Sequence, residues 1–299
     1  KDYNIKNFKL NLASNSCLKK LKNIKKKINL IIDCCAEPSV ELSKKNSKLV
    51  FDSNLRSTLN LLEIARINRS KIIYLSTSRV YSINKINNLF KNINFKNKLK
   101  KNIKINEEFS KESPISFYGF TKLSSEILIK EYSYLYNIKY LINRFGVVSG
   151  YGQFGRQDQG FVSMWLWRHI NRFPITYQGY GGHGNQIRDI LDINDLCLLI
   201  KEQISRISKI NNHTFNAGGG SVNAVSLKEL TSYCEKITKN KIKIKKKIKT
   251  SNYDLRYYIT DNKKIYSKYK WRVSKKLDII LKETFKSLIK NKRTLRKLL

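Results

Sequence analysis

No hydrophobic run in the 299-residue sequence approaches the ~20 residues that a membrane-spanning helix needs, so we expect no such helix. The first residues, KDYNIKNFKL, lack the apolar segment of a signal peptide. Three prolines and 13 glycines are too few for a linker-rich or low-complexity chain. Hydrophobic residues make up 41% of the sequence, which is enough for a buried core. The composition therefore predicts a folded protein without a membrane span.

The sequence is also poor in patterns that bind metal ions. Its five cysteines include no CxxC pair, and its three histidines lie far apart. Neither residue type has the spacing of a zinc site, so we expect no metal. Unpaired thiols are typical of a cytoplasmic protein, and we expect that location for this chain.

Basic residues far outnumber acidic ones, and the resulting net charge of +38 at first suggests nucleic-acid binding. The lysines, however, are spread along the whole chain among Asn and Ile residues, as a bias toward A/T-rich codons would produce. The sequence has no recognisable nucleic-acid module, and runs such as KNIKKK (22–27) are typical of solvated helix faces or loops. We therefore expect no specific nucleic-acid partner.

The first half of the sequence alternates short apolar runs with stretches of helical periodicity, which is typical of parallel α/β units. Strands are predicted at 27–36, 71–78 and 139–145, and helices at 49–68 and 116–136. Residues 83–109 are polar, basic and weakly periodic, so we predict a surface loop insertion there.

The second half has a different mixture of elements. It adds a glycine-rich turn at 180–185, a helix at 192–204, a strand at 213–220 and a lysine-faced edge strand at 241–249. A further helix is predicted at 226–238, with Ser226 as its N-cap and Glu229 completing a capping box. The predicted fold class is α/β, with a Rossmann-type parallel sheet in residues 1–150. Residues 151–299 form mainly a smaller substrate lobe, and some of its segments return to the first domain.

Tyr118 and Lys122 are four residues apart in a predicted helix, so their side chains share one face. An ammonium beside a phenol favours the phenolate. A tyrosine with its usual pKa of about 10 is a base at neutral pH only when positive charge lowers that pKa. The spacing alone is weak evidence, since such pairs are common on helix surfaces. The order of KIIYLSTS, RVYS, YGFTK and NRFG along the chain is much more specific.

This order resembles the extended short-chain dehydrogenase/reductase family, which contains NAD-dependent nucleotide-sugar epimerases and dehydratases. The resemblance implies that Thr77 hydrogen-bonds the reacting sugar hydroxyl and that Tyr118 is the general base. It also implies that Lys122 holds the nicotinamide ribose and lowers the pKa of Tyr118. Ser76 and Ser78 flank Thr77 and are alternative candidates for its role.

The resemblance also implies cofactor contacts in the first half of the chain. The segment CCAEPS follows the strand at 27–36, at the carboxyl edge where open α/β sheets bind ligands. The family pattern places NAD contacts at Ala36 and Asn54. The chain departs from that pattern at Glu37, where glutamine is frequent, and at Ser57-Thr58, where a glycine-threonine pair is usual.

Within the family, residues 144–170 and 175–196 resemble the CDP-paratose 2-epimerase (CDP-tyvelose epimerase) group. The points of likeness are the DQG triplet at 158–160, the GYGG turn and the run QIRDILDINDL. The resemblance implies a substrate contact at Gln159 and contacts to the nucleotide diphosphate at Arg188 and Arg256. A guanidinium suits this task because it binds phosphate oxygens bidentately.

The function implied by the resemblance is inversion of the C2 centre of CDP-paratose to give CDP-tyvelose. Tyr118 would take the proton of the C2 hydroxyl as hydride passes to NAD, leaving a 2-keto sugar that later receives the hydride on its other face. Two alternatives remain open: another nucleotide-sugar epimerase or dehydratase, and a catalytically inactive sugar-nucleotide-binding protein. Ser78-Arg79 stands where a dehydratase has an acidic pair, which argues against elimination chemistry. We also expect a homo-oligomer.

One expected feature is missing from this pattern. No stretch before Lys27 resembles the glycine-rich GxxGxxG turn that binds the NAD pyrophosphate. FKLNLAS (8–14) matches the third strand of the family, with Asn11 where an aspartate is usual. We therefore expect roughly 50 residues upstream of Lys1 in the natural product. We also expect a bare apolar edge on the strand at 27–36 and poor NAD binding by the 299-residue chain.

Overall fold

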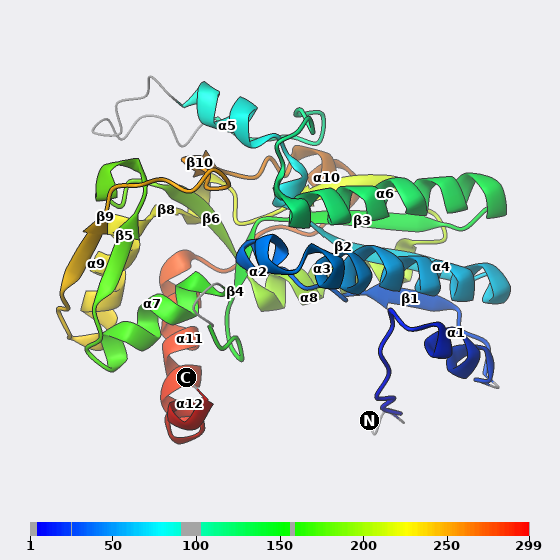
Figure 1. Ribbon diagram of the computed structural model, residues 1–299, viewed down its shortest axis with the longest axis horizontal. Coiled ribbons are helices and arrows are strands. Elements are labelled where there is room, and N and C mark those ends of the chain that lie inside the picture. The colour runs from blue at the N-terminus through cyan, green and yellow to red at the C-terminus, as the bar shows by residue number, and fades with distance from the viewer. Residues whose placement is uncertain (1–4, 25, 91–102, 156–158, 299) are drawn as a thin grey trace.

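A four-stranded parallel sheet forms one half of the molecule in the computed structural model, which describes residues 5–24, 26–90, 103–155 and 159–298 (Figure 1). The strand order is β1-β2-β3-β7. The strands are β1 (Leu30–Asp33), β2 (Lys71–Thr77), β3 (Tyr140–Phe145) and β7 (His213–Ala217). The prediction of a Rossmann-type α/β fold is confirmed, as are the strands predicted at 27–36, 71–78, 139–145 and 213–220.

Helices cover both faces of this sheet. They are α4 (Ser57–Asn68) and α6 (Ser116–Tyr136) on one face, and α8 (Ile193–Arg206) and α10 (Lys263–Lys268) on the other. The side chains of β2 alternate between the two layers because successive residues of a strand point to opposite faces. Ile72 and Tyr74 pack with Leu62 and Ile129, whereas Ile73 packs with Leu199. The sheet is therefore buried on both faces, and its carboxyl edge stays open for a ligand.

The second half of the molecule is a smaller lobe, at the left in Figure 1. One sheet contains β4 (Val147–Ser149), β6 (Ile187–Asp192), β8 (Ala224–Ser226) and β10 (Tyr257–Tyr258), and a two-stranded ribbon pairs β5 (Ile175–Gln178) with β9 (Ile244–Lys247). The helices are α7 (Phe161–Ile170), α9 (Leu227–Thr238), α11 (Leu277–Lys290) and α12 (Lys292–Leu298). The predicted capping box of α9 is confirmed, since Ser226 and Glu229 bond reciprocally. The predicted strand at 241–249 is confirmed as β9, which is exposed throughout.

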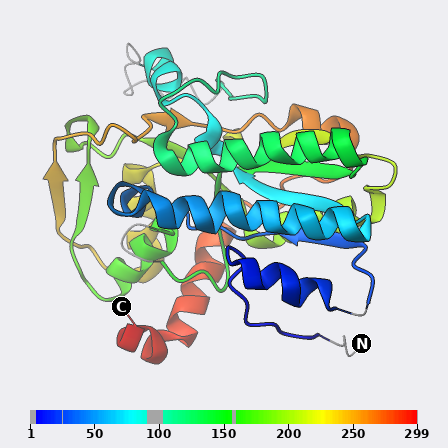
Figure 2. The ribbon, with the colours of Figure 1, turned by 45° about the vertical axis from the view of Figure 1, so that its right-hand side comes forward.

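The outer edge of β1 has no strand partner among the described residues, and Ile32 there is 39% exposed. The prediction of a strand at 8–14 is wrong. That segment runs into α1 (Asn15–Lys22), whose N-cap is Ser14, and the Ser14 side chain accepts a hydrogen bond from the backbone of Cys17. The segment has no strand to pair with among the described residues, and it ends at the N-cap of α1. Figure 2 shows α1 beside α4, and Asn60 of α4 donates to the Leu12 carbonyl at 2.7 Å.

The predicted surface loop at 83–109 is wrong at both of its ends. Residues Ile83–Leu89 form α5, and Phe90 after it stacks on Tyr257 with ring centroids 4.1 Å apart. At the other end Ile105 is buried and bridges Thr260. The middle of the predicted loop, 91–102, lies outside the described residues. Apolar contacts with residues 253–260, far along the chain, hold these ends in place, and local periodicity does not reveal such contacts.

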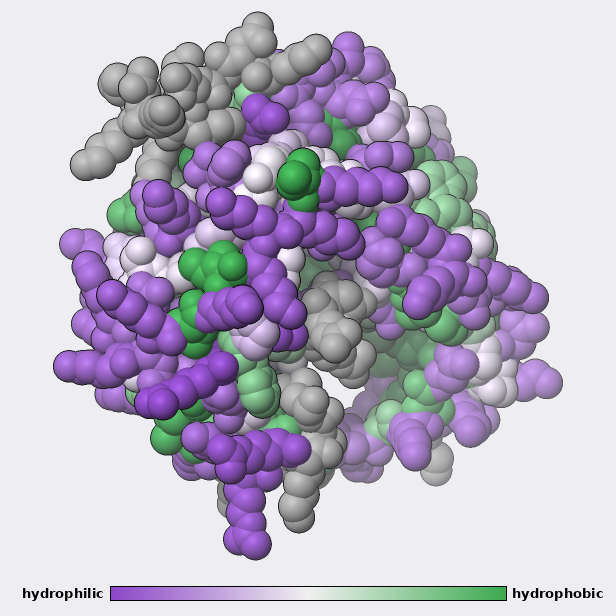
Figure 3. Space-filling model, turned by 60° about the vertical axis from the view of Figure 1, so that its left-hand side comes forward, coloured by the Kyte–Doolittle hydropathy of each residue, from purple (hydrophilic) through white to green (hydrophobic). Residues whose placement is uncertain are grey.

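Hydrophilic side chains cover most of the face shown in Figure 3, with apolar side chains in small scattered groups. The exposed lysines of β9 contribute to the hydrophilic surface of the smaller lobe. In the part of the chain that the structure describes, no helix combines the length and apolarity required to cross a bilayer.

Candidate active site

The candidate site lies at the carboxyl edge of the parallel sheet, where open α/β folds bind ligands. Thr77 is the last residue of β2, and Tyr118 lies in the first turn of α6. The Thr77 hydroxyl is a hydrogen-bond partner of the Tyr118 phenol, and it accepts a bond from the Arg79 N–H at 3.2 Å. Ser76 instead donates to buried Glu126 at 2.6 Å. Of the two hydroxyls, Thr77 is therefore the one that meets Tyr118.

Tyr118 is almost fully buried, and this burial is the main reason why its pKa is raised above the usual value of 10.0. The hydrogen bond from Thr77 and the charge of Arg79 lower its pKa, whereas the charge of Glu37 raises it. The charge of Arg79 acts on Tyr118 in this way, and the role expected of Lys122 stays a prediction. In the protein alone Tyr118 is thus neutral at neutral pH.

Lys122 lies in a buried environment with an aromatic ring and acidic groups nearby. Its ammonium lies 4.0 Å from the ring centroid of Tyr74, and the side chain is 1% exposed. Burial lowers the pKa of Lys122 to about 8, and the charges of Asp33 and Glu126 oppose that shift. Asp33, at the end of β1, is itself buried and accepts a hydrogen bond from Thr58 at 2.9 Å. Lys122 is therefore mostly charged at neutral pH, and the charges of Asp33 and Glu126 favour this form.

Ala36 and Asn54, the two first-half residues expected to contact NAD, differ from each other in exposure. Ala36 is exposed, in the loop after β1. Asn54 is fully buried in a π-helical turn, Asp52–Arg56, that joins α3 (Ser47–Phe51) to α4. Its Oδ1 accepts from the Glu37 N–H at 2.6 Å, and its Nδ2 donates to the Glu37 carbonyl and to Thr121 on α6 at 2.9 Å. Asn54 thus fastens the loop after β1 to the helix that carries Tyr118.

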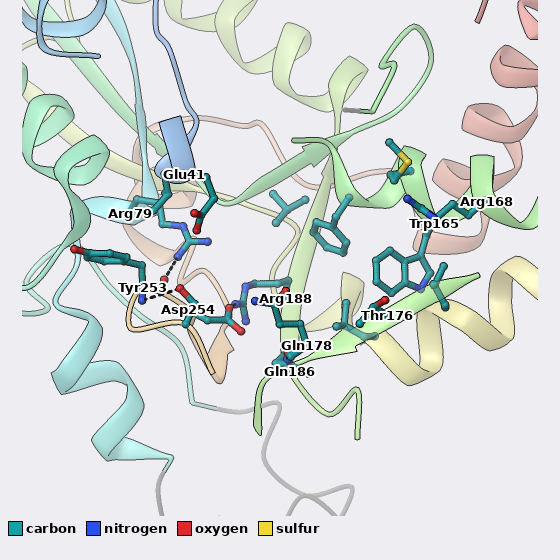
Figure 4. Close-up of a pocket in the computed structure, with 17 residues that line it drawn as sticks. Glu41, Arg79, Trp165, Arg168, Thr176, Gln178, Gln186, Arg188, Tyr253 and Asp254 are labelled. Carbon is teal, nitrogen blue, oxygen red and sulfur yellow. Dashed lines mark hydrogen bonds and ion pairs between the residues drawn. The ribbon is translucent and has the colours of Figure 1, made fainter. Parts of the chain in front are cut away.

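A cavity of about 710 Å³ opens beside this edge, between the sheet domain and the lobe (Figure 4). Its polar lining comes from α2 (Val40–Lys45), the turn after β2, α7, β5, β6 and the loop before β10. The charged lining residues are Glu41, Arg79, Arg168, Arg188 and Asp254. Three guanidiniums against two carboxylates leave an excess of positive charge, which suits an anionic ligand.

Arg188, expected at the diphosphate, lines this cavity on β6. Its guanidinium donates to Asp254 at 3.1 Å and to the Leu255 carbonyl at 2.6 Å. Arg256 is not among the residues that line the cavity, and its guanidinium lies 4.9 Å from the ring centroid of Tyr180. The structure therefore brings only the first of the two predicted arginines into this space.

Gln159, the predicted substrate contact, is half-buried and lies two residues before the start of α7. Asp158 of the same triplet lies outside the described residues. Three lining residues that the sequence reasoning did not single out are Trp165 and Arg168 on α7 and Arg79 after β2. The first two lie inside the stretch 144–170 that carried the family likeness. In the sequence, Arg79 served only as evidence against a dehydratase. Its position two residues after Thr77 could have predicted that it lies near the site.

Comparisons with known proteins agree with this geometry. The chain is 28% identical to CDP-paratose 2-epimerase of Salmonella typhi over 239 residues, which cover 76% of this chain and 68% of that protein. It is 27% identical to UDP-glucuronate 4-epimerase of Thermodesulfobacterium geofontis over 217 residues, 72% of this chain and 59% of that protein. The chain thus spans about three fifths to two thirds of the length of these two relatives.

Solved structures show the same fold. The UDP-glucuronic acid 4-epimerase of Bacillus cereus, in complex with UDP-glucuronic acid and NAD, superposes with a TM-score of 0.75 at 22% identity, covering 93% of this chain and 80% of that one. The NAD dependent epimerase/dehydratase family matches residues 1–218. Both the YGFTK segment and the cofactor-side loop fall within that match. The chain therefore belongs to the NAD dependent epimerase/dehydratase family.

Proposed function

We propose that the chain is an NAD-dependent nucleotide-sugar epimerase, and more specifically that it inverts C2 of CDP-paratose to give CDP-tyvelose. The observation that carries the proposal is the junction of Thr77 and Tyr118 beside a cavity with three arginines. Of two neighbouring hydroxyls, one can take the proton of a sugar alcohol while the other holds its oxygen. Guanidinium groups can bind the oxygens of a diphosphate. The likeness to the Salmonella typhi enzyme supports the sugar, and the UDP-sugar enzymes among the relatives support the reaction class.

The residues at the nicotinamide end fit the cofactor. Thr77, Tyr118 and Lys122 lie at the carboxyl edge of the sheet, and the donor set of two hydroxyls and one ammonium suits a ribose beside an alcohol. These residues would hold that end of NAD, which supplies a hydride acceptor when bound. No glycine precedes Gly119 in the sequence, so the pyrophosphate end has no glycine turn in this part of the chain.

Each protein residue has a distinct task in the proposed reaction. Tyr118 takes the proton from the C2 hydroxyl, and Thr77 holds that oxygen in place during the transfer. Arg188 and Arg168 bind the diphosphate, so the sugar can present its other face without leaving the site. Binding energy from the diphosphate, which does not react, keeps the keto sugar in place. When the keto sugar is reduced on that other face, Tyr118 returns the proton to the C2 oxygen, which restores the hydroxyl with C2 inverted.

We further propose that the acting form is a homo-oligomer of a cytoplasmic protein. All five cysteines are free thiols, which supports the location. Large apolar side chains recur every seven residues on the outer face of α6. They are Phe120 at 44%, Ile127 at 53% and Tyr134 at 88% exposure. Seven-residue spacing keeps side chains on one stripe of a helix, and such a stripe suits the same stripe of a second copy.

The test supplies purified protein with NAD in large excess, because we expect the chain to bind NAD poorly. Separate reactions contain CDP-paratose, UDP-glucuronate and UDP-glucose, and chromatography separates the products. The proposal expects conversion of CDP-paratose to CDP-tyvelose. Conversion of a UDP-sugar alone would keep the epimerase and correct the substrate. Tight CDP binding by calorimetry without conversion of any of the sugars would contradict the epimerase and favour the binding protein.

A further inference from the structure

We propose that Asn87 of α5 is a positioning residue, which holds the guanidinium of Arg188 in place for the diphosphate. The inference rests on the proposed function, in which Arg188 binds that group. Asn87 is not among the residues that line the cavity, so it acts through other residues. It bonds to the backbone of residues 254–256, and oxygen atoms of the same short segment accept hydrogen bonds from Arg188.

Both polar atoms of the Asn87 side chain bond to this segment. The Nδ2 donates to the Asp254 carbonyl at 3.0 Å, and the Oδ1 accepts from the Arg256 N–H at 2.8 Å. An amide carries a donor and an acceptor side by side, so it can hold a short segment of backbone at two points. A carboxylate has no donor, and aspartate at this position could make only the second of these bonds.

Apolar contacts fix α5 against the same segment. Ile86 is buried in one cluster with Tyr257, the residue that follows the segment. Phe90, directly after α5, stacks on the Tyr257 ring with centroids 4.1 Å apart. Figure 1 shows α5 next to β10, which begins at Tyr257. Asn87 is thus presented to the segment by contacts that do not involve its amide.

The segment in turn holds Arg188. The Arg188 guanidinium donates to the Asp254 carboxylate at 3.1 Å (Figure 4) and to the Leu255 carbonyl at 2.6 Å. The Asp254 backbone has a second support in Tyr180, whose hydroxyl donates to the Asp254 carbonyl at 2.8 Å. Burial raises the pKa of Tyr180 to about 12, so this hydroxyl is protonated at neutral pH. The place of the guanidinium therefore depends on two acceptors of one short segment.

One peptide group links Asn87 directly to Arg188. The carbonyl of Leu255 and the N–H of Arg256 belong to the same planar trans unit, so they point in opposite directions. The N–H meets Asn87 on one side, and the carbonyl meets Arg188 on the other. Rotation of this unit would break both bonds. The bond to Asn87 thus fixes the direction in which the carbonyl receives Arg188.

The first experiment observes Arg188 by NMR without a ligand, in protein labelled with ¹⁵N-arginine and with the signals assigned from Arg188→Lys. A guanidinium held by hydrogen bonds rotates slowly, so separate Nη signals are expected in the parent. Asn87→Ala should merge them through faster rotation. Asn87→Asp, which keeps the acceptor and lacks the donor, should do so in part. Asn88→Ala, at the next and exposed position of α5, is the control and should leave the signals unchanged.

The second experiment measures CDP binding by calorimetry. Asn87→Ala should weaken binding roughly three- to tenfold, the usual effect of one lost hydrogen bond. In the Arg188→Ala background the same substitution should have no further effect, because Asn87 acts through Arg188. With CDP-paratose, KM should rise by a similar factor and kcat should hardly change.

The inference would be overturned by Arg188 signals that are the same in the parent and in folded Asn87→Ala. Losses of CDP affinity that add in the double variant would also overturn it, since Asn87 would then act independently of Arg188. If Asn87→Ala does not fold, Asn87→Asp provides the same comparisons. If the parent neither binds CDP nor converts any of the sugars, the proposed function fails, and the Arg188 signals still decide whether Asn87 positions that side chain.

Discussion

Gly119 and Arg79 are in such close contact that a Cβ added at position 119 would lie 2.2 Å from the Arg79 carbonyl oxygen. The neighbour in this contact is backbone, so it cannot move aside as the end of a flexible side chain would. The contact joins the turn after β2 to the first turn of α6, and it thereby sets the distance between Thr77 and Tyr118. The glycine of YGFTK is thus a packing requirement of the site.

Gly119→Ala should therefore destabilise the protein by roughly 1–3 kcal/mol, the usual cost of overpacking, although alanine is the better helix former. Urea denaturation measures the change. Lys130→Ala, at an exposed position of the same helix, is the matched control and should have little effect. Equal stability of Gly119→Ala and the parent would show that the turn can move away from the helix.

Tyr118→Phe should reduce turnover of CDP-paratose by roughly 10²- to 10⁴-fold, the usual contribution of a general base. The ring remains, so packing and affinity for CDP should be nearly unchanged. Steady-state kinetics measure the loss, and calorimetry with CDP measures the binding. Turnover at the parent rate would remove Tyr118 from the mechanism.

Arg188→Ala should weaken CDP binding by roughly 10- to 100-fold, because a charged hydrogen-bond partner of the diphosphate is lost. Isothermal titration calorimetry with CDP measures this. Arg206→Ala on α8 is the control, since Arg206 pairs with Glu202 away from the cavity and should not change the affinity. If both variants bind CDP like the parent, Arg188 only holds Asp254 and Leu255 in place.

Lys122 should make the stability of the protein rise with pH. Burial lowers the pKa of Lys122 from 10.5 to about 8 in the folded protein, so between these values the unfolded chain binds more protons. The free energy of unfolding should then increase by roughly 2 kcal/mol from pH 7 to pH 10 on account of this group. Unfolding in guanidinium chloride at pH 7 and at pH 10, for the parent and for Lys122→Met, measures this increase. The same pH slope in both proteins would mean that Lys122 keeps its ordinary pKa.

Ile127→Lys should convert the oligomer to monomers, because it places a charge in the middle of the apolar stripe of α6. Ile127 is 53% exposed, so the substitution should cost little in folding of the single chain. Sedimentation velocity measures the mass of both proteins. A parent protein that sediments as a monomer would contradict the proposed assembly.

The sequence predicted those parts of the fold whose signals are local. The apolar strands β1, β2 and β3 and the helix with its capping box at Ser226 follow from periodicity and from capping chemistry. Residues 83–90 were missed because Ile83 and Ile86 find their apolar partners near Tyr257, far along the chain. The strand predicted at 8–14 failed because a strand needs a neighbour, and that segment has none among the described residues.

The candidate site shows the same division. Spacing singled out Tyr118 and Lys122, and the resemblance to the family added Thr77. The charges that act on each group depend on packing between segments, so the sequence did not reveal that Arg79 acts on Tyr118 or that Asp33 acts on Lys122. A four-residue spacing places two side chains on one face of a helix. It does not decide which neighbouring charges they meet there.

The most direct test of the proposed reaction is proton NMR of CDP-paratose with excess NAD and the protein in D₂O. The proposed reaction should give CDP-tyvelose whose C2 carries ordinary hydrogen, because hydride leaves and returns at that carbon while Tyr118 exchanges only the hydroxyl proton. Tyr118→Phe should form this product at least roughly 10²-fold more slowly. Incorporation of deuterium at C2, or inversion that persists unchanged in Tyr118→Phe, would contradict it.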